Sequence, residues 1–146
     1  MLGILKICFT GLIIYTNSLT FAGMIEMNGK NTNIAYDENK WESVLSFFEK
    51  QFGRQADLSG IIFIIGHREL GKFKTKFKKE EKQDLMHVGV CSLLSRAGYY
   101  NFVANDADGW PHYEYSRDRP KLDHEQQERL LKKMIIEYLQ EEELVS

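Results

Sequence analysis

The sequence predicts a mainly α-helical protein, with about four helices packed as a small bundle and one aromatic β-hairpin near residues 99–115. Three observations predict this class. Apolar residues recur at intervals of three and four along most of the chain, which is the spacing of amphipathic helices. Glycines follow several of these stretches, where helices commonly end. An aromatic stretch of alternating polarity surrounds an Asp-Gly dipeptide, which favours a tight turn.

Length and composition are those of one globular domain. The chain has 146 residues, of which 43% are hydrophobic and 27% charged, and its net charge is −2. This length is sufficient to bury a core without disulfides or metals, and the charge gives no reason to expect a polyelectrolyte partner. Cys8 lies in an apolar leader, so the folded part holds only Cys91 and we expect no internal disulfide.

Residues 1–23 form an apolar leader that has two interpretations. A basic start at Lys6, an apolar run and small residues near Ala22 are the outline of a secretory signal peptide. Alternatively, the protein starts at Met24 and the leader is a mis-assigned start. We favour a cytoplasmic protein that starts at Met24, with secretion or periplasmic export after cleavage near Ala22 as the alternative. The apolar run is too short for a transmembrane anchor.

Residues 24–36 are predicted to be a flexible entry, followed by a single globular helical domain over residues 37–142. Asp37 can cap the first helix, and Gly53 stands where a left-handed helix end belongs. The apolar run at residues 61–65 fits either a buried helix or a strand.

We interpret that run as a helix, because Asp57 can cap it and the apolar spacing around it is nearly helical. The next helix, over residues 79–97, is apolar on more than one side, and it and the preceding hydrophobic helix should form the centre of the domain. His87 and Cys91 lie one turn apart on it and could supply two metal ligands, although core packing explains both.

The final helix begins at Asp123, with Gln126 placed to complete a capping box. An apolar stripe runs along one face. Residues 143–146 follow as a tail that we expect to fray, because acidic side chains are unfavourable at a helix C-terminus.

The hairpin carries the main candidate site. A two-stranded hairpin is marginal in water, so it must lay an aromatic face on the helices. Interfaces favour Tyr and Trp, and a strand containing Pro111 belongs at a sheet edge. Trp110, His112 and Tyr113 are therefore the candidate partner-binding residues.

The acidic turn of the hairpin suggests a divalent metal held by Asp106, Asp108 and His112, with His67 or His87 brought in by folding. An EF-hand loop does not fit, because its twelfth position would be Tyr115 instead of a carboxylate.

A basic segment alternates lysines with two phenylalanines. Such a pattern could grip a phosphate backbone and stack on bases, or form a connecting loop whose rings enter the core. Because acidic residues follow at once, we favour the loop; the basic patch comprises Lys72, Lys74, Lys76, Lys78 and Lys79.

The string Gly98-Tyr99-Tyr100, followed after the turn by Gly109-Trp110-Pro111-His112, comes after an apolar helix. This half of the chain resembles small uncharacterised helical bacterial proteins. The resemblance implies no activity and favours a bacterial cytoplasmic protein.

Signatures of phosphate loops, nucleophile elbows, paired-cysteine zinc sites and His-Glu-x-x-His helices are missing from the sequence. We therefore predict a non-enzymatic protein-interaction module, with another protein or a second copy as its partner. The alternative is a metal-binding protein or metal-assisted hydrolase using the hairpin turn. A weak nucleic-acid contact through the basic patch is the third interpretation. No cofactor is predicted other than that divalent metal.

Overall fold

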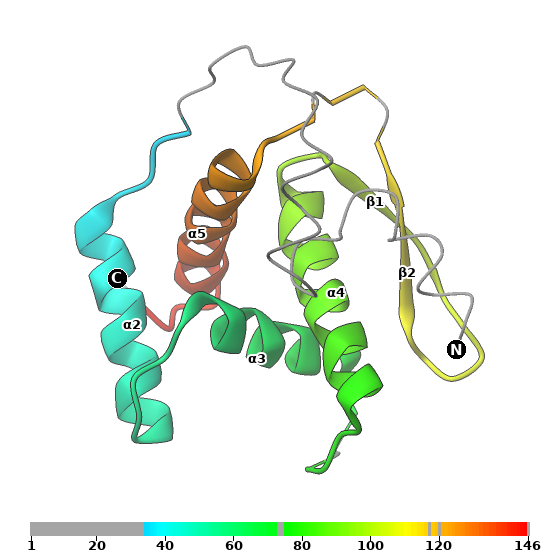
Figure 1. Ribbon diagram of the computed structural model, residues 1–146, viewed down its shortest axis with the longest axis horizontal. Helices are drawn as coiled ribbons and strands as arrows, with labels where there is room; N and C mark the ends of the chain where they lie inside the picture. Colours follow the sequence, from blue (N-terminus) through cyan, green and yellow to red (C-terminus); the bar gives the residue numbers. More distant parts are fainter. Residues whose placement is uncertain (1–33, 73–74, 117, 120, 146) are drawn as a thin grey trace.

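A computed structural model describes residues 34–72, 75–116, 118–119 and 121–145. This part of the chain forms four helices and one antiparallel hairpin, so the predicted mainly α fold is confirmed (Figure 1). The leader and most of the predicted entry lie outside the described residues. In chain order the elements are α2 (Glu38–Phe52), α3 (Leu58–Leu70), α4 (Lys79–Arg96), β1 (Tyr100–Asn105), β2 (Pro111–Tyr115) and α5 (His124–Glu141).

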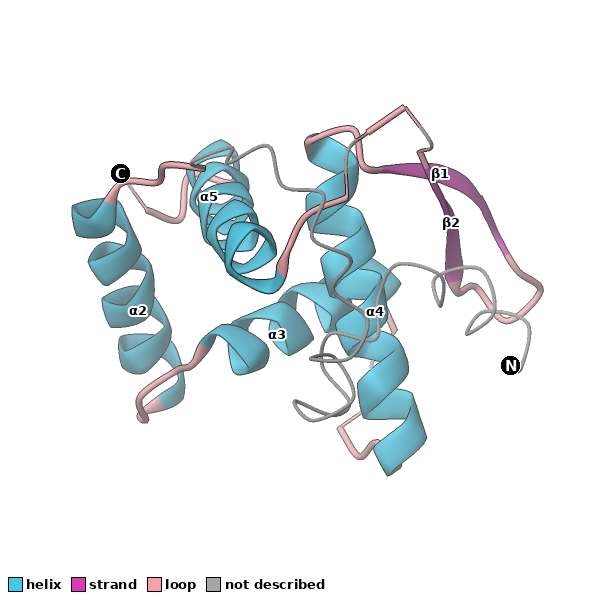
Figure 2. Ribbon diagram, turned by 45° about the horizontal axis from the view of Figure 1, so that its top comes forward, coloured by secondary structure: helices cyan, strands magenta, loops and turns pink. Residues whose placement is uncertain are grey.

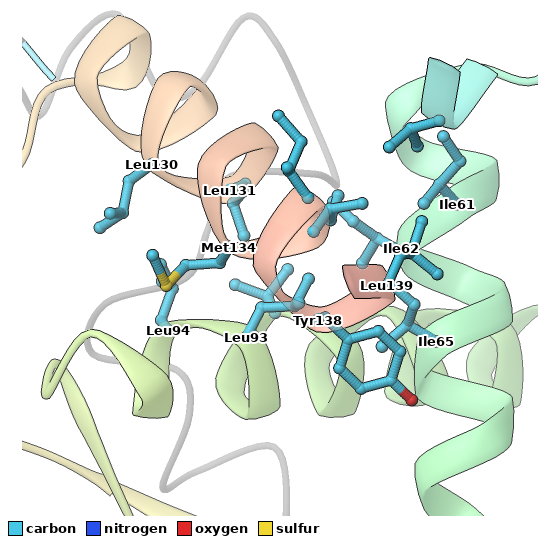
Figure 3. Packing of buried hydrophobic residues seen from close by; sticks show 14 of the residues in the cluster. Ile61, Ile62, Ile65, Leu93, Leu94, Leu130, Leu131, Met134, Tyr138 and Leu139 are labelled. Atoms are coloured by element: carbon cyan, nitrogen blue, oxygen red, sulfur yellow. The ribbon is translucent and has the colours of Figure 1, made fainter. Parts of the chain in front are cut away.

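Helix α4 is the central element, as predicted. It packs against α3, against α5 and against the hairpin, whereas α2 packs on α5 at the opposite side (Figure 1). Large aliphatic side chains from α3, α4 and α5 meet in the core (Figure 3). The most deeply buried of them include Ile61, Ile62, Leu93, Leu131, Ile135 and Leu139.

The helix boundaries follow the local signals in the sequence. The Asp37 carboxylate accepts hydrogen bonds from two backbone amides at the start of α2, and Gly53 ends that helix with φ of 68°. The Asp57 carboxylate accepts from the Gly60 amide at 2.7 Å at the start of α3. The run at residues 61–65 is therefore helical, and the interpretation as a helix is confirmed.

Helices α3 and α4 touch backbone to backbone. A Cβ atom placed on Gly66 would lie 1.8 Å from the carbonyl oxygen of Leu85, and one on Gly89 would lie 2.4 Å from that of Ile62. Each glycine therefore has no space for a side chain. This close crossing explains why two interior helix positions accept the helix-propensity cost of glycine, about 1 kcal/mol each.

The hairpin is a two-stranded antiparallel sheet within the described part of the chain. Its register pairs Tyr100 with Tyr115 and Phe102 with Tyr113, and then shifts by one residue at Val103, which forms a bulge. Both strands contact α4, and Figure 2 shows the hairpin beside that helix. Strand β2 is the more buried of the two, whereas β1 is exposed at every position except Tyr100.

The last turn of α5 is held by partners that are distant in sequence. The Arg68 guanidinium donates to Glu142, and the Arg96 guanidinium donates to Glu141. These pairs compensate acidic charge at the helix C-terminus. The residues expected to fray also carry backbone bonds, because the Leu144 amide donates to the Leu139 carbonyl at 2.9 Å.

Among the described residues, there is no helix with the length and apolar content to cross a bilayer.

Candidate functional site

The hairpin turn is organised by the carboxylate of Asp106. Its Oδ1 atom accepts hydrogen bonds from the backbone amides of Asp108 and Trp110, both at 2.9 Å. The hydrogen bond from the Trp110 amide is the main reason why the pKa of Asp106 lies below its usual value. Gly109 completes the turn with φ of 82°, a conformation that favours glycine.

The other Asp106 oxygen, Oδ2, lies 3.2 Å from Nε2 of His112. The structure thus brings together two of the three predicted metal ligands. The side chain of Asp108 is exposed, and this residue contributes to the turn through its backbone. Its carbonyl accepts a hydrogen bond from the Lys72 ammonium. Within the part of the chain that the structure describes, no three His, Cys, Asp or Glu side chains gather in a metal-binding arrangement.

The two histidines considered as additional ligands lie in the helical part of the molecule. Nε2 of His67 and Nδ1 of His87 are both buried without a hydrogen-bond partner among the described residues. The His67 ring packs edge-on against Phe77, with centroids 5.2 Å apart. Burial lowers the pKa of His87, because a charged imidazole would lose its hydration there.

In the described part of the basic segment, Lys72 and residues 75–78 lie in a connecting loop and Lys79 begins α4. Phe77 packs against Phe63 with ring centroids 5.9 Å apart, so its ring contributes to the smaller of two apolar clusters. Lys72 reaches the hairpin turn, as described above. Lys76, Lys78 and Lys79 are exposed, and Lys74 lies outside the described residues.

The candidate partner-binding residues are largely covered. Trp110 and Tyr113 are 5% and 6% exposed, and their side chains belong to the apolar clusters of the core. His112 is half-buried beside Asp106. These side chains fix the hairpin on the helices, which leaves the opposite strand to face solvent.

Sequence reasoning missed the exposed strand β1. Phe102 and Val103 are 56% and 57% exposed, which is unusual for large apolar side chains in consecutive positions. The bulge at Val103 interrupts the alternation of faces and leaves both side chains at the surface. The spacing of the aromatic residues does not indicate this exposure, because Phe102 stands two positions after Tyr100, as a residue on the same buried face would.

The backbone of β1 also has groups that point away from β2 at Phe102. The Ser116 amide donates to the Tyr99 carbonyl at 2.9 Å, so the pair Tyr99–Ser116 is hydrogen-bonded. Hydrogen-bonded and non-hydrogen-bonded pairs alternate along an antiparallel ladder. The backbone N–H and C=O groups of Phe102 therefore point away from β2, and among the described residues no other strand pairs with Phe102.

Strand β1 has one of the features that usually protect an edge and lacks the others. Lysine, proline and charged side chains that discourage pairing are all missing from the six residues Tyr100–Asn105. The bulge at Val103 is the one protective feature, and it interrupts the edge after Phe102. An extended segment can therefore pair with the first half of the strand.

A small apolar cleft lies at the other side of the molecule. It encloses about 200 Å³ between α2, α3 and the end of α5. Phe52 and Leu144 on its border are 54% and 41% exposed. Its volume is below the range of about 300 to 1,000 Å³ that is typical of small-molecule sites.

Comparison of the chain with protein-family models, with curated proteins and with solved structures finds no match in any of the three.

Proposed function

We propose that the chain is a non-enzymatic protein-interaction module that pairs an extended segment of a partner with the open edge of β1. The observation that supports this proposal most directly is the combination of outward-pointing backbone groups at Phe102 with the exposed, uncharged apolar surface of Phe102 and Val103. In strand addition, backbone hydrogen bonds supply affinity and alternate side chains supply specificity. Both are available on β1.

The packing of β2 supports the same proposal. Tyr113 and Trp110 anchor the hairpin on the helices, so that β1 is held on a rigid support before a partner arrives. Pre-organisation of this kind lowers the entropy lost on binding. A flexible hairpin would lose more entropy on pairing and would bind more weakly.

Site-specific photo-crosslinking tests this function. A photoreactive phenylalanine analogue at Phe102 should give a crosslinked adduct in the cells that naturally make the protein. The same analogue at Glu114, which is exposed on β2, is the matched control. Adduct at position 102 well above that at 114 supports docking at β1. Equal or absent adduct at both positions would contradict it.

A divalent metal at the hairpin turn is the second candidate function. The approach of Asp106 to His112 at 3.2 Å favours it, because a carboxylate and an imidazole are suitable ligands for such an ion. Native mass spectrometry of chain purified without chelators tests this candidate. A bound ion that is lost in the variant Asp106→Asn/His112→Gln supports the metal, whereas the bare chain mass argues against it.

A further inference from the structure

We infer that the apolar cleft between α2, α3 and the end of α5 is the interface of a two-fold symmetric dimer, in which Phe52 of each copy covers the cleft of the other. Figure 1 shows α2 and the hairpin on opposite sides of the molecule. Contact through the cleft therefore leaves β1 of both copies uncovered. This inference goes beyond the proposed function and does not depend on it.

The cleft gathers exposed apolar surface that docking at β1 does not explain. Large apolar side chains are exposed at four positions in the described part of the chain, and two of these lie on β1. The other two, Phe52 and Leu144, are 54% and 41% exposed and both border the cleft. Contiguous apolar surface of this kind is typical of an interaction site.

The volume of the cleft indicates what can enter it. Its volume of about 200 Å³ is smaller than that of a usual small-molecule site. It is larger than a cavity of about 150 Å³ with aliphatic and phenyl walls, which is sufficient to bind benzene. The walls here are largely apolar and include Phe47, Phe48, Ile65 and Leu139. The cleft therefore suits a single phenyl ring.

Phe52 is the exposed phenyl ring at this surface. Its ring stacks on that of Phe48, with centroids 6.0 Å apart and an interplanar angle of 13°, so its position is fixed before association. Such pre-organisation lowers the entropy lost on binding. Because the ring and the cleft lie side by side, a two-fold axis beside Phe52 lets each copy cover the cleft of the other. A self-complementary contact of this type closes a dimer.

The charges beside the cleft favour a second copy as the occupant. At the end of α2, the exposed side chains of Lys50 and Arg54 outnumber that of Glu49. At the end of α5, Glu143 is exposed and follows two glutamates that are paired with arginines. A two-fold axis between these two ends places the basic end of each copy against the acidic end of the other. Opposite charges across an interface favour this arrangement.

Analytical ultracentrifugation of the full chain over a concentration series tests the dimer. Because the contact buries little surface, we expect a weak dimer with a dissociation constant in the micromolar range. Phe52→Lys places a charge at the apolar cleft and should weaken dimerisation about tenfold or more. Phe102→Lys is the matched control, because Phe102 is 56% exposed but lies on β1. It should leave the dimer unchanged.

A charge reversal provides a second test that keeps the apolar side chains. Arg54→Glu brings like charges together across the axis and should weaken the dimer several-fold. Adding Glu143→Arg to the same chain should restore the dimer, because opposite charges then meet again. Both positions are exposed, so these variants should fold normally. A double variant as weak as Arg54→Glu alone would overturn the two-fold arrangement.

The remaining outcomes are equally decisive. A concentration-dependent dimer that Phe52→Lys weakens and Phe102→Lys does not supports the inference. A monomer at all concentrations overturns it, and so does a dimer that Phe52→Lys leaves intact. The photo-crosslinked adduct at Phe102 tests docking at β1 separately, so the failure of one proposal is distinguishable from the failure of the other.

Discussion

Replacing Gly66 by alanine should destabilise the fold strongly, because the added methyl group has no space. The new Cβ would lie 1.8 Å from the carbonyl oxygen of Leu85 and 3.0 Å from the amide nitrogen of Gly89. Both are backbone atoms, so relief requires α3 and α4 to separate. Such overpacking costs typically 1–3 kcal/mol and occasionally more. Alanine returns about 1 kcal/mol of helix propensity.

The clash is severe because it involves two backbones, so its cost should lie at the upper end of that range. We expect a net loss of about 2 kcal/mol in the free energy of unfolding. This is a substantial fraction of the 5 to 15 kcal/mol that is typical of a domain. Urea denaturation followed by circular dichroism measures the loss as a shift of the midpoint at constant slope.

Gly60→Ala is the matched control in the same helix. Its Cβ would meet only the Asp57 side-chain oxygen, at 3.0 Å, and that carboxylate can move slightly. We expect a change of less than about 1 kcal/mol. If Gly66→Ala were as stable as the unchanged protein, the close crossing of α3 and α4 would be refuted.

Three further predictions concern titratable groups and the turn. Burial lowers the pKa of His87 from 6.5, so its contribution to stability should be present above pH 6.5 and be lost as pH falls below it. The variant His87→Gln should flatten this pH dependence of the unfolding free energy, measured by urea titration. An unchanged pH dependence would contradict a buried neutral imidazole. Burial and the neighbouring Glu69 raise the pKa of Tyr138 to about 12, so stability should fall as pH rises from 10 towards 12. Tyr138→Phe should reduce that loss in alkaline unfolding measurements, and equal alkaline sensitivity of both proteins would argue against the burial. Asp106→Ala should accelerate hydrogen exchange of the Asp108 and Trp110 amides, because both lose their acceptor. Asp106→Asn retains an acceptor oxygen and should accelerate their exchange less. Equal exchange in both variants would show that the side chain does not hold the turn.

Local signals made much of the fold predictable. Asp37 and Asp57 each satisfy free amides at a helix start, and Gly53 adopts a backbone conformation that favours glycine. Each of these effects depends on a few neighbouring residues, so the sequence reveals it directly. The run at residues 61–65 was correctly interpreted because its cap decided between two otherwise equal patterns.

Long-range packing was not predictable in the same way. The sequence shows that Gly66 needs a close neighbour, but it does not show that Gly89 supplies it from α4. The pairing of Arg68 with Glu142 joins residues that are 74 positions apart. Such contacts depend on how the helices cross, and no periodicity encodes that geometry.

The candidate site was predictable only in part. The approach of Asp106 to His112 was expected, since a tight turn brings both ends of the loop together. The exposure of Phe102 and Val103 in consecutive positions accompanies a bulge at Val103, which no residue type at that position signals. A shift of one residue in register changes which side chains face solvent, and only the three-dimensional structure fixes it.

Amide hydrogen exchange along β1 tests the central claim most directly. In the full chain, the Asn101 amide is bonded within the hairpin, whereas the Phe102 amide points away from β2. We predict that exchange at Phe102 slows on addition of an extract from the cells that make the protein or as chain concentration rises, while exchange at Asn101 is unaffected. Fast exchange at Phe102 under both conditions would contradict docking at the edge of β1.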